Sequence, residues 1–510
     1  MESDLVKAWS RDYEDYLHDE SRRIGSADSI SFPTCEAEVS EIINSFSDAM
    51  NIAPDQKLNI TIQGARTGIV AGAVPQGGHV LNMSHMKNIS QIDNENGRLT
   101  VQPGVLLSEI QSAVSKEGFF FPPDPTETSA SIGGMVACNA SGAMSFAYGP
   151  TRNWIDSLRV VLSDGSTLFL KRSENYAQDR SFSLITENGR IIAGDLPYYI
   201  LPNVKSAAGY YVSDNMDLID LFIGMEGTLG VVSEIGLRLT LRPKAVAGLA
   251  VFLPSEEAAL KLVRILRGEI VDGFEQMTAR PVAIEFFNCD ALDMLRRAKS
   301  NYPAFEAIPA LKPHFHTAIY TEFHGENEDE LEEAVMQAMD AIVALGGNDD
   351  DTWYATSDRE MQPLKAFRHA IPEAVNLLID ERKRNCPELT KLGTDMSVPD
   401  THLETVLSMY KTGLSEEDLE SVIFGHIGNN HVHVNILPKN MDDYERGKSL
   451  YLRWAGQILD LGGSVSAEHG IGKIKAPFLK MMYGDEGIAQ MRALRQLFDP
   501  DMILNPGNLF

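Results

Sequence analysis

The chain has few cysteines, no long apolar run and little positive charge, and each shortage excludes a class of protein. Its 4 cysteines among 510 residues show no CxxC spacing, so we expect no iron–sulfur or zinc-ribbon site and infer a reducing compartment. No apolar run reaches the roughly 18 residues of a transmembrane helix. The N-terminal MESDLVKAWSRDYED has neither a basic nor an apolar region, so we expect no secretion signal and a cytoplasmic protein.

The charge balance argues against two kinds of partner. With 72 Asp and Glu against 44 Lys and Arg, the formal net charge is −28. Such a charge repels nucleic-acid phosphates and anionic lipid surfaces, so neither is expected as a partner, and solubility is its simplest role. Length suggests two or three domains, and 44% hydrophobic with 23% charged residues is ordinary for a globular protein.

The densest cluster of candidate site residues is FGHIGNNHVHVN at residues 424–435. His431, His433 and Asn435 alternate with aliphatic residues, so in one strand they would share a face turned toward a site. The glycine and two asparagines before them are turn formers. They predict a β-hairpin in which His426, on the preceding strand, faces His433. Two imidazoles would then converge on one point.

A glycine-rich stretch near the N-terminus is suited to binding an anion. Residues 1–30 predict a polar helical lead-in, residues 38–50 a helix, and residues 58–62 a strand that runs into QGARTGIVAGAVPQGG. Glycine lets backbone N–H groups approach a phosphate closely. The glycine spacing is not that of a Rossmann fold.

The next segment strengthens the case for a cofactor. Residues 99–105 predict a strand and residues 106–116 an amphipathic helix, and the 24-residue FFFPPDPTETSASIGGMVACNASG follows. A loop of that length is usually functional. Its small residues let the backbone approach a flat ring, and its SIGG turn opens a helix whose N–H groups suit a phosphate or a flavin carbonyl.

After residue 245 the pattern changes to alternating amphipathic helices and strands. Helices are expected at residues 255–269, 291–298 and 327–345, and strands at 282–287 and 317–322. Such alternation predicts an α+β cap laid over a cofactor domain.

Four separated motifs in one order indicate a known family. They are GARTG, PPDPTETSASIGGMVACNASG, YGPTRNWI and GMEGTLGVVSEIGLRL. From about residue 30 onward the chain resembles the FAD-linked D-2-hydroxyacid dehydrogenases, of the D-lactate dehydrogenase and glycolate oxidase flavin subunit type, within the vanillyl-alcohol-oxidase superfamily. The resemblance implies an α+β fold in which a two-subdomain FAD-binding domain of vanillyl-alcohol-oxidase type carries an α+β substrate cap. The expected domains are a lead-in (1–30), an FAD-binding domain (31–245), a cap with a metal site (246–465) and a C-terminal segment that returns to the FAD domain (466–510).

The resemblance implies FAD and the residues that contact it. The phosphate loop has no histidine, and a glycine follows Tyr148, so we expect non-covalent FAD. Asn505 in the C-terminal tail is a further candidate contact. The implied pyrophosphate contacts are Gly64, Ala65, Arg66, Thr67 and Gly68, and the implied flavin contacts are Pro122, Thr128, Gly133, Gly134, Asn139, Ser141, Tyr148, Gly149, Glu226, Gly227 and Val231.

The resemblance also implies a metal site and an acid/base. His426, His433 and Glu468 would hold a divalent cation, and His469, next in SAEHGIG, would be the acid/base and contact the substrate. Two imidazoles and one carboxylate that leave open positions suit a catalytic zinc ion, with manganese or iron(II) as alternatives.

The third histidine departs from the family pattern. Relatives usually carry Asp-Gly-Asn where this chain has Asn429, Asn430 and His431. His431 therefore either contacts the metal or its bound water, or supports the ligands through hydrogen bonds.

A substrate carboxylate has two candidate partners. Arg368, in FRHAIPEAVN, is a planar donor suited to bidentate binding, and the family's substrate-binding arginine falls in this motif. Asn435 is the second candidate. The implied reaction oxidises a small D-2-hydroxy acid, D-lactate or glycolate, to the 2-oxo acid: the hydroxyl proton passes to His469 and the hydride to flavin N5.

Three alternatives stay open. D-2-hydroxyglutarate dehydrogenases carry a lysine where this chain has Gly393, two positions before Asp395, which disfavours a dicarboxylate, although the nearby Lys391 could substitute. Alkyl-dihydroxyacetone-phosphate synthase uses this fold for a transferase. The chain could also be the flavin subunit of a larger electron-transfer complex. Oxygen, a quinone, a cytochrome, an electron-transferring flavoprotein and an iron–sulfur subunit are all open as acceptors, and homodimer and heteromer as assemblies.

Overall fold

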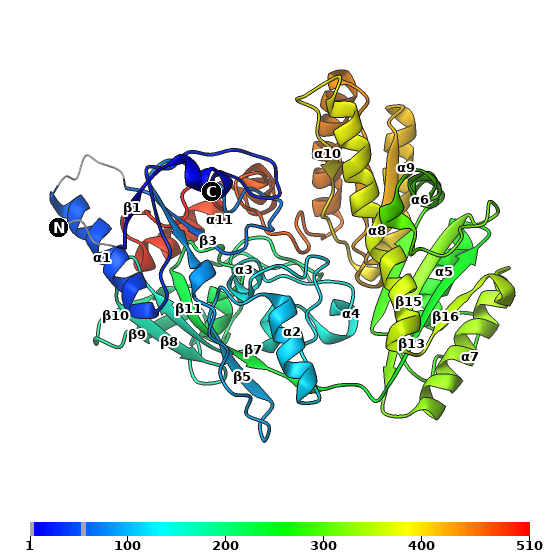
Figure 1. The fold of residues 1–510 in the computed structure, drawn as a ribbon, viewed down its shortest axis with the longest axis horizontal. Coiled ribbons are helices and arrows are strands. Elements are labelled where there is room, and N and C mark those ends of the chain that lie inside the picture. The colour runs from blue at the N-terminus through cyan, green and yellow to red at the C-terminus, as the bar shows by residue number, and fades with distance from the viewer. Residues whose placement is uncertain (1–4, 53–57) are drawn as a thin grey trace.

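The computed structural model describes residues 5–52 and 58–510, which form two lobes (Figure 1). The first lobe holds the chain up to β12 (Thr240–Leu241) together with the C-terminal helix α11 (Ala476–Phe498). The second holds the chain from β13 (Ala245–Leu253) to α10 (Met441–Asp460). Within the described ranges, no helix combines the length and apolarity needed to cross a membrane. The first four residues of the expected lead-in lie outside the described residues.

Two four-stranded sheets joined by a helix form the core of the first lobe. Helix α1 (Glu36–Ile52) buries Val39, Ile42 and Ile43, which its 3.6-residue period places on one face, against residues of both sheets. The first sheet has the order β1 (Lys7–Ala8), β2 (Ser29–Ser31), β4 (His79–Asn82) and β3 (Ile60–Gln63), and the second has the order β5 (Arg98–Val101), β11 (Val231–Arg238), β7 (Ile155–Val161) and β8 (Thr167–Lys171).

Smaller elements complete this lobe. Helix α3 begins directly after the serine of SIGG, where a helix was expected to open. Two strand pairs are β6 (Phe119–Phe120) with β12, and β9 (Ser181–Ile185) with β10 (Ile191–Asp195). The helices are α2 (Leu107–Lys116), α3 (Ile132–Cys138) and α4 (Ser145–Tyr148), with short 3-10 helices η1 (Arg11–Leu17), η2 (Met83–His85), η3 (Thr151–Trp154) and η4 (Leu218–Phe222).

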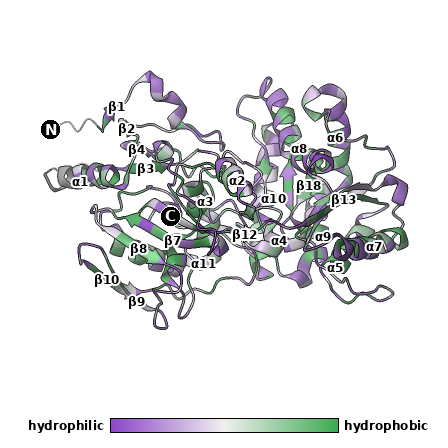
Figure 2. Cartoon of the chain, turned by 60° about the horizontal axis from the view of Figure 1, so that its bottom comes forward, coloured by the Kyte–Doolittle hydropathy of each residue, from purple (hydrophilic) through white to green (hydrophobic). Residues whose placement is uncertain are grey.

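The second lobe is a seven-stranded antiparallel sheet covered on both faces. Alternate residues of β15 point to opposite faces: Ile319 and Phe323 pack toward α5 and α7, whereas Ala318 and Tyr320 pack toward α6 and α8. Because both faces are buried, β13 is a continuous apolar run, AVAGLAVFL. Helices α5 and α7 show both green and purple segments, as expected for helices with one apolar face (Figure 2).

The bounds of the second lobe's elements are as follows. The sheet has the order β16 (Trp353–Ala355), β13, β15 (Thr317–Gly325), β14 (Ala283–Phe287), β18 (Ser421–Gly425), β19 (His433–Ile436) and β17 (Leu392–Gly393). The helices are α5 (Glu256–Leu266), α6 (Cys289–Asn301), α7 (Glu328–Ala344), α8 (Asp358–Lys383), α9 (Leu403–Glu416) and α10, with 3-10 helices η5 (Pro303–Phe305), η6 (Asp349–Asp351), η7 (Asp400–His402) and η8 (Ile427–Asn429).

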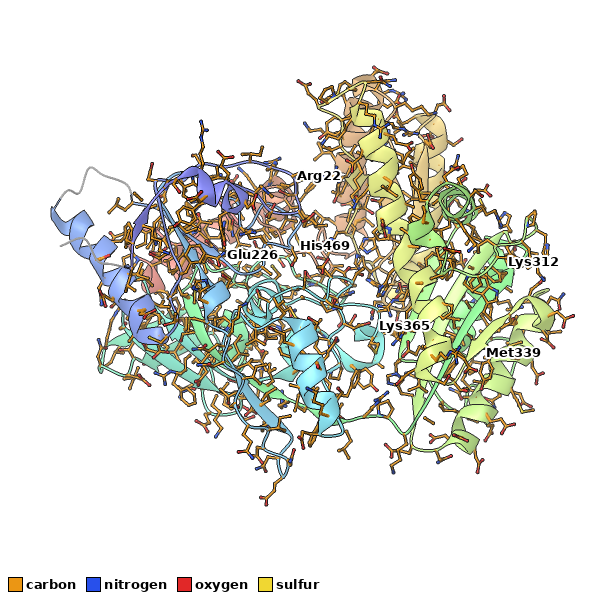
Figure 3. All side chains as sticks on the ribbon, viewed as in Figure 1. Arg22, Glu226, Lys312, Met339, Lys365 and His469 are labelled. Atoms are coloured by element: carbon orange, nitrogen blue, oxygen red, sulfur yellow. The ribbon has the colours of Figure 1, made fainter. Side chains whose placement is uncertain are left out.

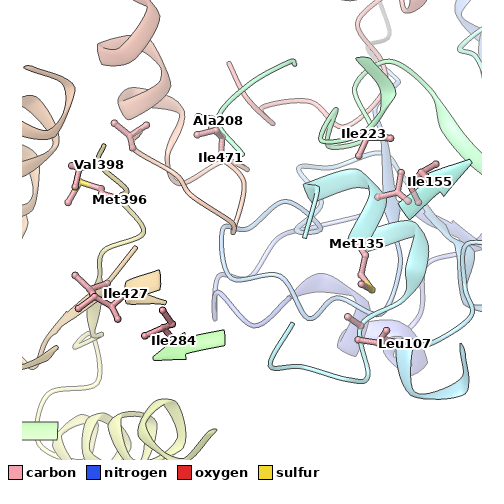
Figure 4. Packing of buried hydrophobic residues seen from close by; sticks show 14 of the residues in the cluster. Leu107, Met135, Ile155, Ala208, Ile223, Ile284, Met396, Val398, Ile427 and Ile471 are labelled. Atoms are coloured by element: carbon pink, nitrogen blue, oxygen red, sulfur yellow. The ribbon is translucent and has the colours of Figure 1, made fainter. Parts of the chain in front are cut away.

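The chain crosses back to the first lobe after α10. Helix α10 packs with α9 in the second lobe, and α11 packs against β10 in the first, so residues 461–475 run between the lobes. One buried apolar cluster includes side chains of both lobes, and Ile471 and Ala208 lie between Ile427 on one side and Ile223 on the other (Figure 4). The segment that carries Glu468 and His469 is therefore fixed between the two lobes.

The structure confirms the expected mixed helix and strand content and most expected elements. The helices expected at residues 38–50 and 106–116 are α1 and α2, those expected after residue 245 are α5, α6 and α7, and the two expected strands are β14 and β15. The lead-in differs: it contains strands β1 and β2 and a 3-10 helix. The reason is tertiary, because β2 pairs in parallel with β4 and so becomes part of the first sheet.

We predict that Asp499 anchors the C-terminal return. Its fully buried carboxylate accepts the backbone N–H groups of Ile503 and Leu504, at 3.1 and 3.0 Å, and lies 3.2 Å from Arg495. Asp499→Ala leaves the buried guanidinium without its carboxylate partner, so unfolding should become easier by about 3 kcal/mol and the melting temperature should fall. The exposed Asp501→Ala is the matched control. Equal melting temperatures for the two variants would contradict this role.

Candidate active site

The two lobes enclose a cavity of about 840 Å³. Its wall runs from residues 64–68 of the first lobe, past α3, to the β18–β19 hairpin of the second. In Figure 3, His469 lies between the lobes and Glu226 within the first. Residues expected to bind FAD, metal and substrate therefore line one continuous space.

Three side chains expected to hold a metal converge at this cavity. Glu468 Oε1 lies 3.2 Å from His426 Nε2 and 3.5 Å from His433 Nε2. Ligand atoms that each lie about 2.1 Å from one ion are roughly 3 to 3.5 Å apart, so this spacing fits a single divalent cation. His469 Nε2 lies 3.5 Å from the same oxygen. The expected base is thus adjacent to the expected ligands.

The tautomers of the two ligand histidines also fit a metal. His426 Nδ1 donates to Glu285 Oε1 at 2.8 Å, and His433 Nδ1 donates to the Thr394 carbonyl at 3.0 Å. Carboxylate and carbonyl oxygens only accept hydrogen bonds, so each Nδ1 carries a proton. A cation can then take the lone pair of each Nε2, in place of the proton that His426 Nε2 otherwise donates to Glu468 Oε1 at 3.2 Å, and supporting groups commonly impose this arrangement on metal-binding histidines.

Buried carboxylates give the cluster a preference for positive charge. Burial alone would lower the pKa of His426, but Glu285 and Glu468 outweigh it and raise that pKa to about 9. Burial alone would raise the pKa of Glu468, but His426, Lys205 and His431 hold it well below its ordinary value. The site therefore favours a positive charge between these groups, carried by a proton or by a metal ion.

The second oxygen of Glu468 is held from the first lobe. Lys205 Nζ lies 2.7 Å from Glu468 Oε2, and the Ser141 hydroxyl donates to the same oxygen at 3.1 Å. Ser141 was expected to line the flavin, and it does line the cavity. Glu468 thus presents Oε1 to the histidines while Oε2 is occupied by hydrogen-bond donors.

Asp395 organises the turn that carries Glu468 and His469. Its buried carboxylate accepts the backbone N–H groups of both residues, at 3.2 and 3.1 Å, and lies 2.5 Å from Lys475 Nζ. It also lies 3.4 Å from His469 Nδ1, so it can orient that imidazole. Burial alone would raise the pKa of Asp395, but His469 and Lys475 hold it well below its ordinary value.

The expected hairpin is present, but His426 does not lie on its strand. Strands β18 and β19 pair with Phe424 opposite His433. Gly425, at φ +123°, ends β18, so His426 lies just beyond it, at the start of η8. The turn lets His426 reach both Glu285 and Glu468.

A buried arginine fixes this turn. Arg267 donates to the Ile427 carbonyl and to the Asn430 side chain. Asn430 adopts the left-handed conformation at φ +52°, which asparagine tolerates well. The backbone around the histidines is therefore held from the second lobe.

His431 does not share the strand face expected for it. It precedes β19 and is fully buried, whereas His433 and Asn435 line the cavity. His431 Nε2 lies 3.0 Å from Asp395 Oδ1, and Nδ1 lies 3.4 Å from Lys205 Nζ. Both of its ring nitrogens thus face partners behind the cavity wall.

Arg368, expected to bind a substrate carboxylate, lines the cavity and pairs across the lobes. Its guanidinium lies 2.9 Å from Asp124 Oδ2, and both side chains are buried. A second link runs through alternate residues of β15. The Glu322 carboxylate accepts from Tyr320 (2.6 Å) and from His324 (3.0 Å), whose other nitrogen lies 2.7 Å from the Tyr148 hydroxyl. These contacts hold Arg368 and the cap against the first lobe.

The expected FAD contacts divide into two sets. Those that line the cavity are Gly64, Ala65, Arg66, Thr67, Gly68, Gly133, Gly134, Ser141, Glu226, Gly227 and Asn505. Those outside its lining are Pro122, Thr128, Asn139, Tyr148, Gly149 and Val231. Gly68 shows open space where a Cβ would lie, and the α3 wall is built of small residues, so the first set fits an extended, flat cofactor.

The carboxylate of Glu226, expected to contact the flavin, is hydrogen-bonded to the protein backbone. It accepts the backbone N–H groups of Ile471 and Gly472 at 2.6 and 2.7 Å, and Asn505 donates to its carbonyl at 2.7 Å. Burial raises the pKa of Glu226 to about 7, against the opposing effect of these backbone bonds. Glu226 thus ties the Glu468–His469 turn and the C-terminal tail to the first lobe.

Comparison with known families decides the identity of the fold. Residues 29–171 match the FAD binding domain family. Residues 242–509, more than half of the chain, match the family of FAD linked oxidases, C-terminal domain. The chain belongs to the FAD-linked oxidases. The expected vanillyl-alcohol-oxidase type fold, the FAD-binding domain and the expectation of an oxidoreductase are confirmed.

This FAD-linked oxidase has full-length relatives. It is 28% identical to the glycolate oxidase subunit GlcD of Bacillus subtilis, over 91% of this chain and 86% of that protein. It is 28% identical to a D-lactate dehydrogenase of Anaerostipes hadrus (97% and 92%) and 29% identical to a D-2-hydroxyglutarate dehydrogenase of Xanthomonas citri pv. viticola (99% and 94%). A solved alkyldihydroxyacetonephosphate synthase superposes with a TM-score of 0.65 at 15% identity, over 99% of this chain and 82% of that one, which is a likeness of fold.

Four residues of the FAD-linked oxidase's site were missed or undervalued from sequence. Glu285 had a signal, because it is the lone charge in the apolar strand VAIEFF. Asp124 lies within a quoted motif, and Asp395 marked a motif without a role. Lys205 had no signal, because only the fold brings its loop to Glu468.

We predict that Glu226 makes stability depend on pH. A carboxyl whose pKa rises from 4.5 unfolded to about 7 folded stabilises the protein when protonated, so its contribution falls as pH rises from about 4.5 to 7. Glu226→Gln mimics the protonated form and should remove about 3 kcal/mol of that fall. Unfolding free energies of the FAD-loaded proteins at pH 4.5 and 8 measure this. Parallel curves for wild type and variant would contradict the raised pKa.

Proposed function

We propose that this chain is an FAD-dependent, divalent-metal-assisted dehydrogenase that oxidises a small D-2-hydroxy acid, D-lactate or glycolate, to the 2-oxo acid. The observation that carries the proposal is the convergence of His426 Nε2, His433 Nε2, Glu468 Oε1 and His469 Nε2 at the wall of the inter-lobe cavity. The names of the relatives, which include a D-lactate dehydrogenase and a glycolate oxidase subunit, support the reaction type.

FAD would lie along the first-lobe wall of the cavity. Residues 64–68 would contact the pyrophosphate, and Gly133, Gly134 and Ser141 the flavin. Bound FAD supplies the two-electron acceptor for the hydride from C2 of the substrate. Non-covalent binding of FAD is supported by the state of Cys138, the cysteine beside the cavity. Burial raises the pKa of its thiol to about 12, which leaves the thiol unreactive toward the flavin.

His426, His433 and Glu468 would hold the cation. Two imidazole nitrogens and one carboxylate oxygen suit zinc, manganese or iron(II). Such a cation supplies Lewis acidity, which lowers the pKa of a hydroxyl beside it. The supporting hydrogen bonds from Glu285 and Thr394 keep both imidazoles in the ligand tautomer.

The chain's own residues would then bind the substrate and move its proton. His469 accepts the hydroxyl proton at Nε2, and Asp395 beside Nδ1 orients the ring and stabilises the imidazolium that forms. Arg368 and Asn435, which both line the cavity, would bind the carboxylate. Asp124 holds the guanidinium in place before the substrate enters.

A second candidate is oxidation of D-2-hydroxyglutarate. Lys391 lines the same cavity, donates to Asn376 at 2.9 Å and could bind a distal carboxylate. Against this, Gly393 occupies the position of the relatives' lysine, and a Cβ there would lie 3.1 Å from Asn435 Oδ1. Gly393 supplies no cation for a second carboxylate, which favours the smaller acid.

The electron acceptor and any partner subunit belong to the same proposal. The residues named above are proposed to bind FAD, the metal and the substrate. The electron acceptor would be oxygen, a quinone, a cytochrome, an electron-transferring flavoprotein or an iron–sulfur subunit. We propose a cytoplasmic protein that acts as a homodimer or within a heteromeric complex. Flavin bleaching by a hydroxy acid would distinguish a dehydrogenase from a transferase, because only the dehydrogenase reaction reduces the flavin with such a substrate.

We predict that His469→Gln keeps bound FAD but slows flavin reduction at least ~100-fold, because the hydroxyl proton loses its acceptor. Anaerobic stopped-flow absorbance measures the rate, and the spectrum of the oxidised protein measures FAD content. His314→Gln, an exposed histidine of the second lobe, is the matched control. A near-normal reduction rate in His469→Gln would remove the residue from the mechanism.

We predict that substrate size and metal content both control flavin reduction. D-lactate or glycolate should reduce the flavin faster than D-2-hydroxyglutarate under anaerobic conditions. Chelator treatment should remove the metal and the reduction together, and Zn²⁺ or Mn²⁺ should restore both. Reduction by the dicarboxylate alone would contradict the preferred substrate, and an unchanged rate in metal-free protein would contradict metal assistance.

A further inference from the structure

Lys205 approaches the metal-ligand cluster from behind the cavity wall. Its loop runs beside the segment before Glu468: Ala207 N donates to the Ser466 carbonyl at 2.8 Å, and the Ser206 and Ser464 hydroxyls lie 2.9 Å apart. The Ser397 hydroxyl also donates to the Lys205 carbonyl at 2.5 Å. These bonds fix the backbone from which the side chain extends.

The Lys205 ammonium contacts two atoms that could otherwise bind a cation. Its side chain is 9% exposed, and Nζ lies 2.7 Å from Glu468 Oε2 and 3.4 Å from His431 Nδ1. An ammonium only donates, so His431 Nδ1 must accept and Nε2 must carry the proton. Asp395 Oδ1 lies 3.0 Å from Nε2, but Nε2 makes no hydrogen bond to it.

His431 is close enough to become a fourth ligand. One nitrogen each of His426, His431 and His433 and one oxygen of Glu468 lie within 4.8 Å of one another. A catalytic metal needs positions left open for substrate, whereas a site closed by four protein ligands is structural. Something must therefore keep His431 from closing this site.

We propose that Lys205 limits the metal site to three protein ligands by occupying Glu468 Oε2 and His431 Nδ1. The inference rests on the metal-assisted function proposed above. Glu468 would then offer a bound ion Oε1 alone, and His431 stays between Lys205 and Asp395, with Nδ1 hydrogen-bonded to Lys205. The first lobe thereby sets the coordination number of a site built mainly by the second.

Cobalt(II) tests the inference, because its visible absorption depends on the number and geometry of its ligands. Chelator-treated holoprotein would be titrated with Co²⁺ in wild type, Lys205→Met, His431→Asn and the double variant, with the exposed Lys439→Met as control. Lys205→Met should change the spectrum and bind Co²⁺ at least ~10-fold more tightly, because a positive charge is lost and ligand atoms are freed. His431→Asn alone should change neither property, and the double variant should move back toward the wild-type spectrum, because it lacks the freed imidazole and retains only the release of Glu468 Oε2.

Several results would overturn the inference. They are a wild-type spectrum in Lys205→Met, weaker Co²⁺ binding in that variant, or a double variant whose spectrum is identical with that of Lys205→Met. FAD content and melting temperature report folding, and Lys205→Gln repeats the test with a polar side chain. Wild-type protein that takes up no Co²⁺ would contradict the metal-assisted function as well, so the two failures are distinguishable.

Discussion

Three buried carboxylates in one small volume are the constraint on which this structure depends. Glu285, Glu468 and Asp395 are each less than a tenth exposed, and buried carboxylates are costly unless positive charges or hydrogen-bond donors surround them. The partners come from distant segments: His426 from the hairpin turn, Lys205 from the first lobe, and Lys475 from the connection into α11. Charge compensation and catalytic geometry therefore require the same arrangement, and neither lobe can supply it alone.

The same demand explains how the lobes are joined. The connection after α10 carries Glu468 and His469 between the lobes. Asp395 of the second lobe accepts the backbone N–H groups of this pair, and Glu226 of the first accepts those of Ile471 and Gly472. The Arg368–Asp124 ion pair adds a further buried link at the cavity wall. A cofactor bound along the first lobe would thus face a metal and a base that are fixed relative to it. Such a fixed arrangement favours hydride transfer without a large conformational change.

Sequence patterns predicted most helices and strands, because hydrophobic period is a local signal, and histidine spacing singled out side chains that the structure brings close together. They misplaced His426 on a strand, because the positive φ at Gly425 ends that strand early, and they placed His431 on the wrong face of the hairpin. The partners of these residues depend on long-range packing: Lys205 meets Glu468 across 263 positions and Arg368 meets Asp124 across 244. Glu285, the partner of His426, did have a local signal, because it is a charge within an apolar strand.

The central claim is that His426, His433 and Glu468 hold one divalent ion beside His469 at the inter-lobe cavity. Anomalous diffraction from crystals of the FAD-loaded protein soaked in Mn²⁺ tests it most directly. We expect one strong peak at about 2.1 to 2.3 Å from His426 Nε2, His433 Nε2 and Glu468 Oε1, with Lys205 still hydrogen-bonded to Oε2. A peak coordinated by Asp395 and His469 instead, or no peak within reach of the two histidines, would contradict it.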